Sequence, residues 1–294
     1  MRRLGFKGLT WRHILRIPLT QSLKTLVLKC MGLYFNKYPY ATCNRRGIRY
    51  SLDRRQLIDL NIYLKGKWEE DTVDFLEKYL LPGDIVLEVG ANVGAHTCTI
   101  AKTIQPNGML YAFEPAGYAR QKLLYNLSLN SGIQSCVKVL ANPVTDNELN
   151  LPWLEIRSSF SAKSLDKTER TEMDKITTKP ISIDQFIEAS SEIDHVKLIK
   201  IDVDGYDYKV LKGATETLRR FRPMVFVEFC EQALNGQGDS IVDIYELLRG
   251  LGYDKCFLPN FKIGLSVNEA LARCKTDFGF NVIFSPPEHS LSGF

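Results

Sequence analysis

Short apolar runs and longer amphipathic segments alternate along most of the chain. The short runs are typical of strands that are buried on both faces, and the longer segments have the apolar spacing of helices that pack on a sheet. This alternation predicts an α/β fold with a mostly parallel, doubly wound sheet and helices on both faces. We expect strands at 85–89, 109–113, 137–140, 197–202 and 224–228, and helices at 69–81, 94–104, 117–130, 183–190, 206–221 and 241–250.

Weaker patterns flank these elements. Residues 48–52 and 60–64 have the alternation of two short strands, and residues 256–258 and 280–284 predict a closing strand pair. Residues 163–179 are dense in Lys, Asp, Glu and Thr, which favours a surface loop or lid.

The amino-terminal segment is a basic arm. Residues 1–52 hold eleven of the chain's 38 Lys and Arg residues and none of its 34 Asp and Glu residues. Pro18 and Gly32 delimit a predicted amphipathic helix within it. This helix has three open interpretations: it lies on an anionic membrane, it packs on the catalytic domain, or it is a targeting segment. We expect a basic helical extension at 1–46 and one α/β domain at 47–294.

Composition narrows the class of protein. The chain of 294 residues is 45% hydrophobic and 24% charged, which is ordinary for a globular enzyme. Its seven cysteines are scattered without a Cys-x-x-Cys pair, so we expect neither a disulfide framework nor a zinc site. No apolar run is long enough to cross a bilayer. We therefore expect a cytoplasmic protein, with a peripheral position at the membrane as the alternative.

Residues 85–94 predict a cofactor site. An apolar strand ends in Glu88 and leads through Gly90 and Gly94 into a helix, a pattern in which glycine lets the backbone turn tightly and approach a ligand. Asn92 replaces the glycine that a dinucleotide pyrophosphate requires, and Glu88 would repel a phosphate but attract a cationic amino group. Glu114 follows twenty residues after Gly94, at the expected place for a carboxylate that binds ribose hydroxyls. A ligand with ribose, a cation and no phosphate fits S-adenosylmethionine better than NAD.

Three segments together resemble the FkbM family of S-adenosylmethionine-dependent methyltransferases. They are Glu88 to Gly94, residues 113–115 and residues 199–207, and the similarity extends from Trp68-Glu69 to Glu228. This sequence departs from the family at Asp204 and Asp207, where Glu is usual, and at His96, which is more often aromatic. The resemblance implies a Rossmann-like class I methyltransferase fold and, commonly, a hydroxyl acceptor on a sugar, lipid or secondary metabolite. From pattern and resemblance together, the expected cofactor-binding residues are Glu69, Glu88, Gly90, Ala91, Asn92, Gly94, Thr97, Glu114, Asn142 and Asp202.

The expected chemistry lies beyond the carboxyl ends of two strands. A hydroxyl acceptor needs a general base or a metal ion to lower its pKa. Asp202 and Glu228 end adjacent predicted strands, and Lys200 lies two residues before Asp202 on the same side. We expect Asp202 to act as the base, or Asp202 and Glu228 to bind a divalent cation. The alternative is that Lys200, Asp202 and Glu228 form a buried ion-pair network that only holds loops.

Three other functions stay open. The basic arm permits a nucleic-acid methyltransferase, although we expect no nucleic acid because the sequence shows no base-reading module. A nicotinamide dehydrogenase is disfavoured by Asn92 and Glu88. A non-catalytic S-adenosylmethionine-binding protein is the third, because fold alone does not establish activity. The sequence identifies neither the acceptor nor the oligomeric state.

Overall fold

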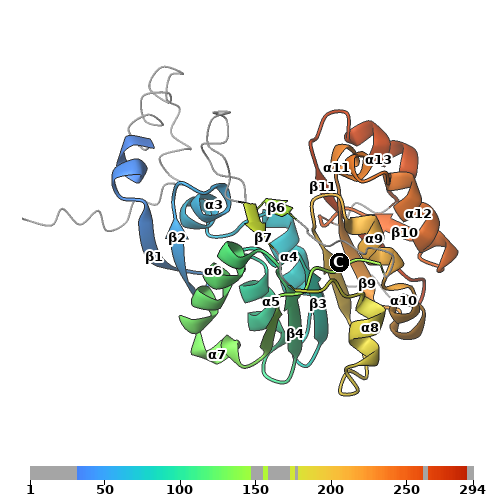
Figure 1. Cartoon of the computed structure of the whole chain (residues 1–294), viewed down its shortest axis with the longest axis horizontal. Helices are drawn as coiled ribbons and strands as arrows, with labels where there is room; N and C mark the ends of the chain where they lie inside the picture. The colour runs from blue at the N-terminus through green and yellow to red at the C-terminus, as the bar shows by residue number, and fades with distance from the viewer. Residues whose placement is uncertain (1–31, 147–154, 158–172, 176–177, 261–263, 290–294) are drawn as a thin grey trace, which may run out of the picture. The chain divides into compact units, whose positions relative to one another are not determined.

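The structure is a computed structural model that describes residues 32–146, 155–157, 173–175, 178–260 and 264–289 (Figure 1). These residues fall into two compact units, the first ending at Trp68 and the second beginning at Glu69. Residues 1–31, which hold most of the predicted helix between Pro18 and Gly32, lie outside the described residues, as does most of the predicted polar loop at 163–179. The prediction that Gly32 ends this helix is wrong, because residues 32–37 are helical. Within that loop, β7 (Met173–Lys175) pairs antiparallel with β6 (Glu155–Arg157).

The first unit contains a hairpin and a helix. Strands β1 (Tyr40–Arg45) and β2 (Ile48–Asp53) pair antiparallel across a turn at Arg46 and Gly47, both of which have positive φ. The expected domain boundary between residues 46 and 47 falls in this turn, and the division into domains stays a prediction.

The prediction of a strand at 60–64 is wrong, because α3 (Leu57–Lys65) occupies this segment. Leu57, Leu60 and Leu64 have the i, i+3, i+7 spacing of one helix face, which the strand interpretation overlooked. The helix is fixed at its start by the Asp59 carboxylate, which accepts a hydrogen bond from the Asp53 N–H at 2.5 Å. Gly66, in the left-handed conformation, ends it.

The second unit is built on a seven-stranded sheet with the order β5-β4-β3-β8-β9-β11-β10. The five strands from β5 to β9 pair in parallel, and β11 runs antiparallel to both of its neighbours. This order confirms the predicted mostly parallel, doubly wound sheet. The strands are β3 (Ile85–Val89), β4 (Met109–Phe113), β5 (Val137–Leu140), β8 (Leu198–Ile201), β9 (Met224–Phe229), β10 (Lys255–Phe257) and β11 (Phe280–Ser285).

Helices cover both faces of this sheet (Figure 1). On one face, strand residues such as Leu87, Ile199 and Val225 share a buried cluster with Phe186 and Ile244 from the covering helices. The helices associated with this cluster are α8 (Ile183–Glu188), α9 (Asp207–Lys212), α10 (Thr215–Phe221) and α12 (Ile241–Gly250).

The opposite face carries α4 (Glu70–Tyr79), which packs beside α5 (Thr97–Ile104). The ring of Phe75 on α4 lies 6.0 Å from that of Phe226 on β9. Further helices are α6 (Gly117–Ser128), α7 (Ser131–Gln134), α11 (Glu231–Gly236) and α13 (Val267–Arg273). Among the described residues, no helix is both long and apolar enough to cross a membrane.

The helix predicted at 206–221 is divided into α9 and α10 at Gly213. A Cβ atom at Gly213 would lie 2.4 Å from the backbone oxygen of Thr145, so the chain passes very close to a neighbouring segment there. The remaining helices and strands of the core agree with their predictions to within a few residues.

The predicted closing pair is confirmed as β10 and β11. Because β11 is antiparallel to β9, its first residues lie beside the carboxyl end of β9, with Asn281 opposite Glu228. This pairing brings a distant part of the sequence to the edge of the sheet where the functional residues gather.

The fully buried ring of Phe226 provides a test of this packing. It lies between Phe75 and the ammonium group of Lys200, which is 5.8 Å from its centroid. We expect Phe226→Ala to lower the free energy of unfolding by about 3–5 kcal/mol in urea titrations, because it removes buried area and leaves a cavity. The matched change Leu124→Ala, at an exposed site on α6, should cost no more than about 0.5 kcal/mol. Equal losses for the two variants would contradict the assignment of Phe226 to the core.

Candidate functional site

The glycine turn after β3 is shaped by left-handed residues. Gly90, Asn92 and Gly94 have φ angles of 86°, 49° and 87°. A Cβ atom on Gly90 would lie 1.9 Å from the backbone oxygen of Asp202, so this turn touches the carboxyl end of β8. A Cβ atom on Gly94 would lie 2.5 Å from the side chain of Leu123, so helix α6 packs closely against this end of the turn. Both glycines are thus required by close packing within the protein.

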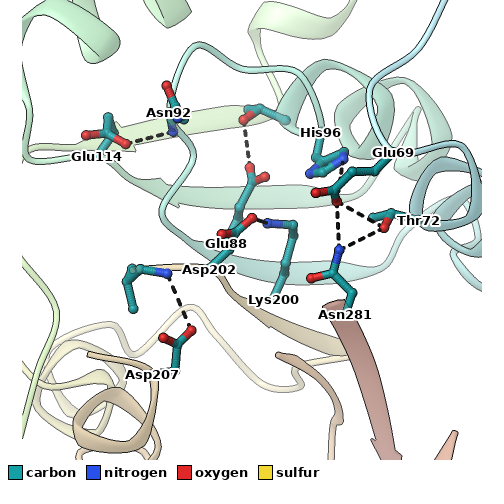
Figure 2. A network of polar contacts seen from close by, with 12 residues as sticks. Glu69, Thr72, Glu88, Asn92, His96, Glu114, Lys200, Asp202, Asp207 and Asn281 are labelled. Atoms are coloured by element: carbon teal, nitrogen blue, oxygen red, sulfur yellow. Dashed lines mark hydrogen bonds and ion pairs between the residues drawn. The ribbon is translucent and has the colours of Figure 1, made fainter. Parts of the chain in front are cut away.

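Glu114 closes the other side of this turn. One of its carboxylate oxygens accepts a hydrogen bond from the Asn92 N–H at 2.7 Å (Figure 2). The other accepts one from the Ala116 N–H at 2.8 Å. Burial raises the pKa of Glu114 to about 6, although these two hydrogen bonds oppose the rise. The side-chain oxygen of Asn92 is buried and has no hydrogen-bond partner among the described residues.

Glu88 lies beneath the turn and is fully buried. Its carboxylate accepts a hydrogen bond from the Thr97 hydroxyl at 2.7 Å, at the first residue of α5 (Figure 2). Burial raises its pKa to about 7, partly offset by Lys200 and the Thr97 hydrogen bond. In this arrangement Glu88 ties β3 to α5, and its direct contact with a ligand stays a prediction.

Lys200 stands at the centre of the site. Its side chain is 1% exposed, and its Nζ lies 3.0 Å from a carboxylate oxygen of Asp202, whose side chain is 29% exposed. Burial lowers the pKa of Lys200, but Asp202, Glu88 and Glu69 together outweigh burial and hold this pKa above its usual value. Lys200 is therefore a permanent cation at neutral pH.

Glu69 joins three separate segments (Figure 2). Its Oε2 accepts hydrogen bonds from the Thr72 hydroxyl at 3.2 Å and from the Asn281 amide at 2.8 Å, and it lies 3.6 Å from Nε2 of His96. Burial and the nearby Asp202 carboxylate raise its pKa, while Lys200 lowers it. The sequence analysis noted His96 as a departure from the family pattern, and Asn281 carried no local signal.

Glu228 approaches the same region from β9. A Cβ atom on Gly279 would lie 2.9 Å from its Oε1, so the carboxyl group rests against the chain that enters β11. Burial, reinforced by the carboxylates of Asp202 and Asp207, raises the pKa of Glu228 to about 9. It is therefore protonated at neutral pH. Asp207 instead accepts the backbone N–H of Gly205 at 3.0 Å and supports the turn after β8.

Most of the residues expected from the sequence meet in this region. Asn142 follows β5, and its side-chain amide donates to the backbone oxygen of Lys179 at 3.0 Å. The cofactor-binding and catalytic roles of all these residues stay predictions.

The alternative of a metal ion held by Asp202 and Glu228 stays a prediction. Within the described segments, no three His, Cys, Asp or Glu side chains are placed to hold a metal ion. The cation next to Asp202 in the structure is the ammonium group of Lys200, 3.0 Å from a carboxylate oxygen.

The raised pKa of Glu88 predicts a measurable pH dependence. The pKa of Glu88 is about 7 in the folded protein, whereas a Glu in an unfolded chain has a pKa of about 4. As the pH rises, the unfolded chain therefore loses this proton first. The group therefore lowers stability progressively up to about pH 7 and by a constant amount above it. In urea titrations, Glu88→Gln should reduce the loss of unfolding free energy between about pH 5 and 7.5, by up to roughly 3 kcal/mol. The control Glu216→Gln, at an exposed site, should keep the wild-type dependence. An unchanged pH dependence in Glu88→Gln would refute the assignment.

Comparisons with known proteins identify the family of this chain. The Methyltransferase FkbM domain matches residues 88–255. The hexuronic acid methyltransferase AglP of Haloferax volcanii is 28% identical over 151 residues, which are 51% of this chain and 58% of that protein. The chain thus spans a little over half the length of this curated relative.

Solved structures of methyltransferases match the chain at low sequence identity. The FkbM methyltransferase of Methylobacillus flagellatus matches with a TM-score of 0.45 and 13% identity, over 76% of this chain and 52% of that chain. An S-adenosylmethionine-dependent O-methyltransferase of Thermotoga maritima matches with a TM-score of 0.42 and 11% identity, over 86% and 80%. The family match covers more than half of this chain and confirms the predicted class I methyltransferase fold. The chain belongs to the FkbM family of methyltransferases.

Proposed function

We propose that this protein transfers a methyl group from S-adenosylmethionine to an acceptor hydroxyl. The observation that carries the proposal is the contact between the glycine turn and Asp202, where Gly90 has room for no side chain. This contact puts a predicted cofactor loop and a partly exposed carboxylate at one point of the sheet edge. Ligands of open α/β sheets bind at this edge, beyond the carboxyl ends of the strands.

The residues of the turn suit S-adenosylmethionine. The carboxylate oxygens of Glu114 each keep a lone pair beyond the hydrogen bonds that they already accept, and these can receive ribose hydroxyls. The unpartnered oxygen of Asn92 offers a further acceptor beside them. When bound, the cofactor supplies an electrophilic methyl carbon on a sulfonium group.

Asp202 is our candidate for the general base. A neutral hydroxyl is a weak nucleophile, and a carboxylate within hydrogen-bond reach can take its proton as the new bond forms. Lys200 cannot take this proton, because its raised pKa keeps it an ammonium ion. We assign it a positioning role, in which the 3.0 Å ion pair fixes the direction of the Asp202 carboxylate.

A glycan hydroxyl is the acceptor that we propose. The support is the similarity to AglP, which methylates a hexuronic acid according to its name. The association of the basic arm with an anionic membrane, which would favour a lipid-linked glycan, stays a prediction.

The variant Asp202→Asn tests the proposed base. We expect methyl transfer to fall at least about hundredfold, because the amide cannot accept the proton, while cofactor affinity stays within a few-fold. Methyl transfer is measured by mass spectrometry, with isotopically labelled S-adenosylmethionine as donor and a panel of methyl glycosides as acceptors. Cofactor affinity is measured by calorimetric titration. Asp194→Asn, at a largely exposed site, is the matched control and should leave both unchanged. Wild-type transfer in Asp202→Asn would overturn the role of this carboxylate.

A further inference from the structure

We propose that the amino-terminal end of β11 forms the acceptor subsite, where the ring of Phe278 stacks on an uncharged sugar and Glu228 hydrogen-bonds one of its hydroxyls. This inference rests on the proposed function, since it names the class of acceptor that the same site takes. Four observations support it, from an unused carboxyl group, an exposed ring, a buried amide oxygen and the local charge.

Glu228 is a carboxyl group without a protein partner. Its side chain is half-buried, yet no hydrogen bond joins it to another described residue. The neighbouring acids Glu69, Asp202 and Asp207 all have such bonds. A protonated carboxyl group both donates and accepts, so Glu228 can bind a sugar hydroxyl in either direction.

Phe278 is the most exposed large apolar side chain of the second unit's described residues, at 71%. It directly precedes Gly279, whose backbone lies against the Glu228 carboxyl group. Consecutive Cα atoms are about 3.8 Å apart, so the Cα atom that carries this ring is the direct neighbour of the residue that lies against the carboxyl group. An exposed aromatic side chain beside a polar cluster is typical of a binding site, since water gives the ring no compensating contact.

Asn281 contributes a polar wall next to Glu228, which it faces across the β9–β11 pairing. Its amide nitrogen donates to Glu69 at 2.8 Å, and its buried oxygen has no partner among the described residues. A pyranose ring has an apolar C–H face and hydroxyls around its edge. A ring such as Phe278 suits the face, and planar amide and carboxyl groups suit the edge.

The charge of the site favours an uncharged sugar. Carboxyl groups of Glu69, Asp202 and Glu228 surround it, and the cation among them, Lys200, is already bound to Asp202. Arg273, whose guanidinium lies 4.7 Å from the Phe280 ring, is likewise bound to Asp277 at 2.8 Å. A carboxylate on the acceptor would find each of these two cations already paired with an acid, whereas an uncharged sugar needs no counter-ion. The acceptor inferred here thus differs from the hexuronic acid of the relative's name.

Ligand-observed NMR with defined sugars tests the proposal on the full chain saturated with S-adenosylhomocysteine. The probes are the methyl glycosides of glucose, galactose and mannose, with methyl glucuronoside as the charged comparison. We expect saturation transfer to the C–H protons of at least one neutral glycoside, and at least tenfold weaker binding of the glucuronoside. Phe278→Ala should weaken the neutral sugar at least tenfold, and Phe278→Trp should retain it.

Matched variants separate binding from folding. Tyr125→Ala removes another exposed ring, on α6 and 55% exposed, and should change nothing. Glu228→Leu should lose the sugar, whereas Glu228→Gln, which keeps a donor and an acceptor, should keep it. Unaltered S-adenosylhomocysteine binding in each variant shows that the fold is intact.

Several results would overturn the inference. They are the absence of binding for all three neutral glycosides, equal or tighter binding of the glucuronoside, or unchanged binding in Phe278→Ala. Sugar binding without methyl transfer would refute the proposed function and leave the subsite standing. Methyl transfer to a hydroxyl compound that is not a sugar, without sugar binding, would refute the subsite and leave the proposed methyl transfer to a hydroxyl standing.

Discussion

The buried ammonium group of Lys200 is the constraint on which the site depends. Moving such a charge from water into a protein interior costs several kcal/mol unless anionic groups surround it. Lys200 lies on β8, between β3 and β9, and its side chain is almost completely buried. Glu88 faces it from β3, Asp202 follows on its own strand, and Glu69 approaches from the start of α4. The fold must bring these carboxylates together, because without them the lysine would be an uncompensated charge in the core.

One cation among several acids also sets their protonation. Asp202 has the ammonium group as a direct partner, whereas burial and mutual repulsion raise the pKa values of Glu88 to about 7 and of Glu228 to about 9. The neighbouring acids of the site therefore differ in how readily they lose a proton, and Glu228 holds its proton to a higher pH than Glu88. Such a difference between neighbouring acids is a common basis for separate roles in catalysis and binding. In the proposed reaction Asp202 takes a proton while Glu228 can donate a hydrogen bond.

The sequence reveals the core of the fold because its strands are buried on both faces and its helices on one. The pattern is ambiguous where an element is short. Residues 60–64 alternate like a strand but form part of α3, and Gly213 divides a helix for a reason that lies in the distant backbone of Thr145. Similarly, the motif identified Gly90 as a special position, but only the structure shows that the backbone of Asp202 occupies the space of its missing side chain.

The two halves of the site differ in how far the sequence can reveal them. The cofactor half is formed by consecutive residues, since Glu88, the glycine turn and Thr97 follow one another, so a local motif suffices to predict it. The proposed acceptor half depends on the pairing of β11 with β9. This pairing places Asn281 opposite Glu228, and the Asn281 amide donates a hydrogen bond to Glu69. No local pattern encodes such a pairing. For the same reason, changes around Phe278 can alter the acceptor while the Lys200 cluster and the glycine turn stay intact.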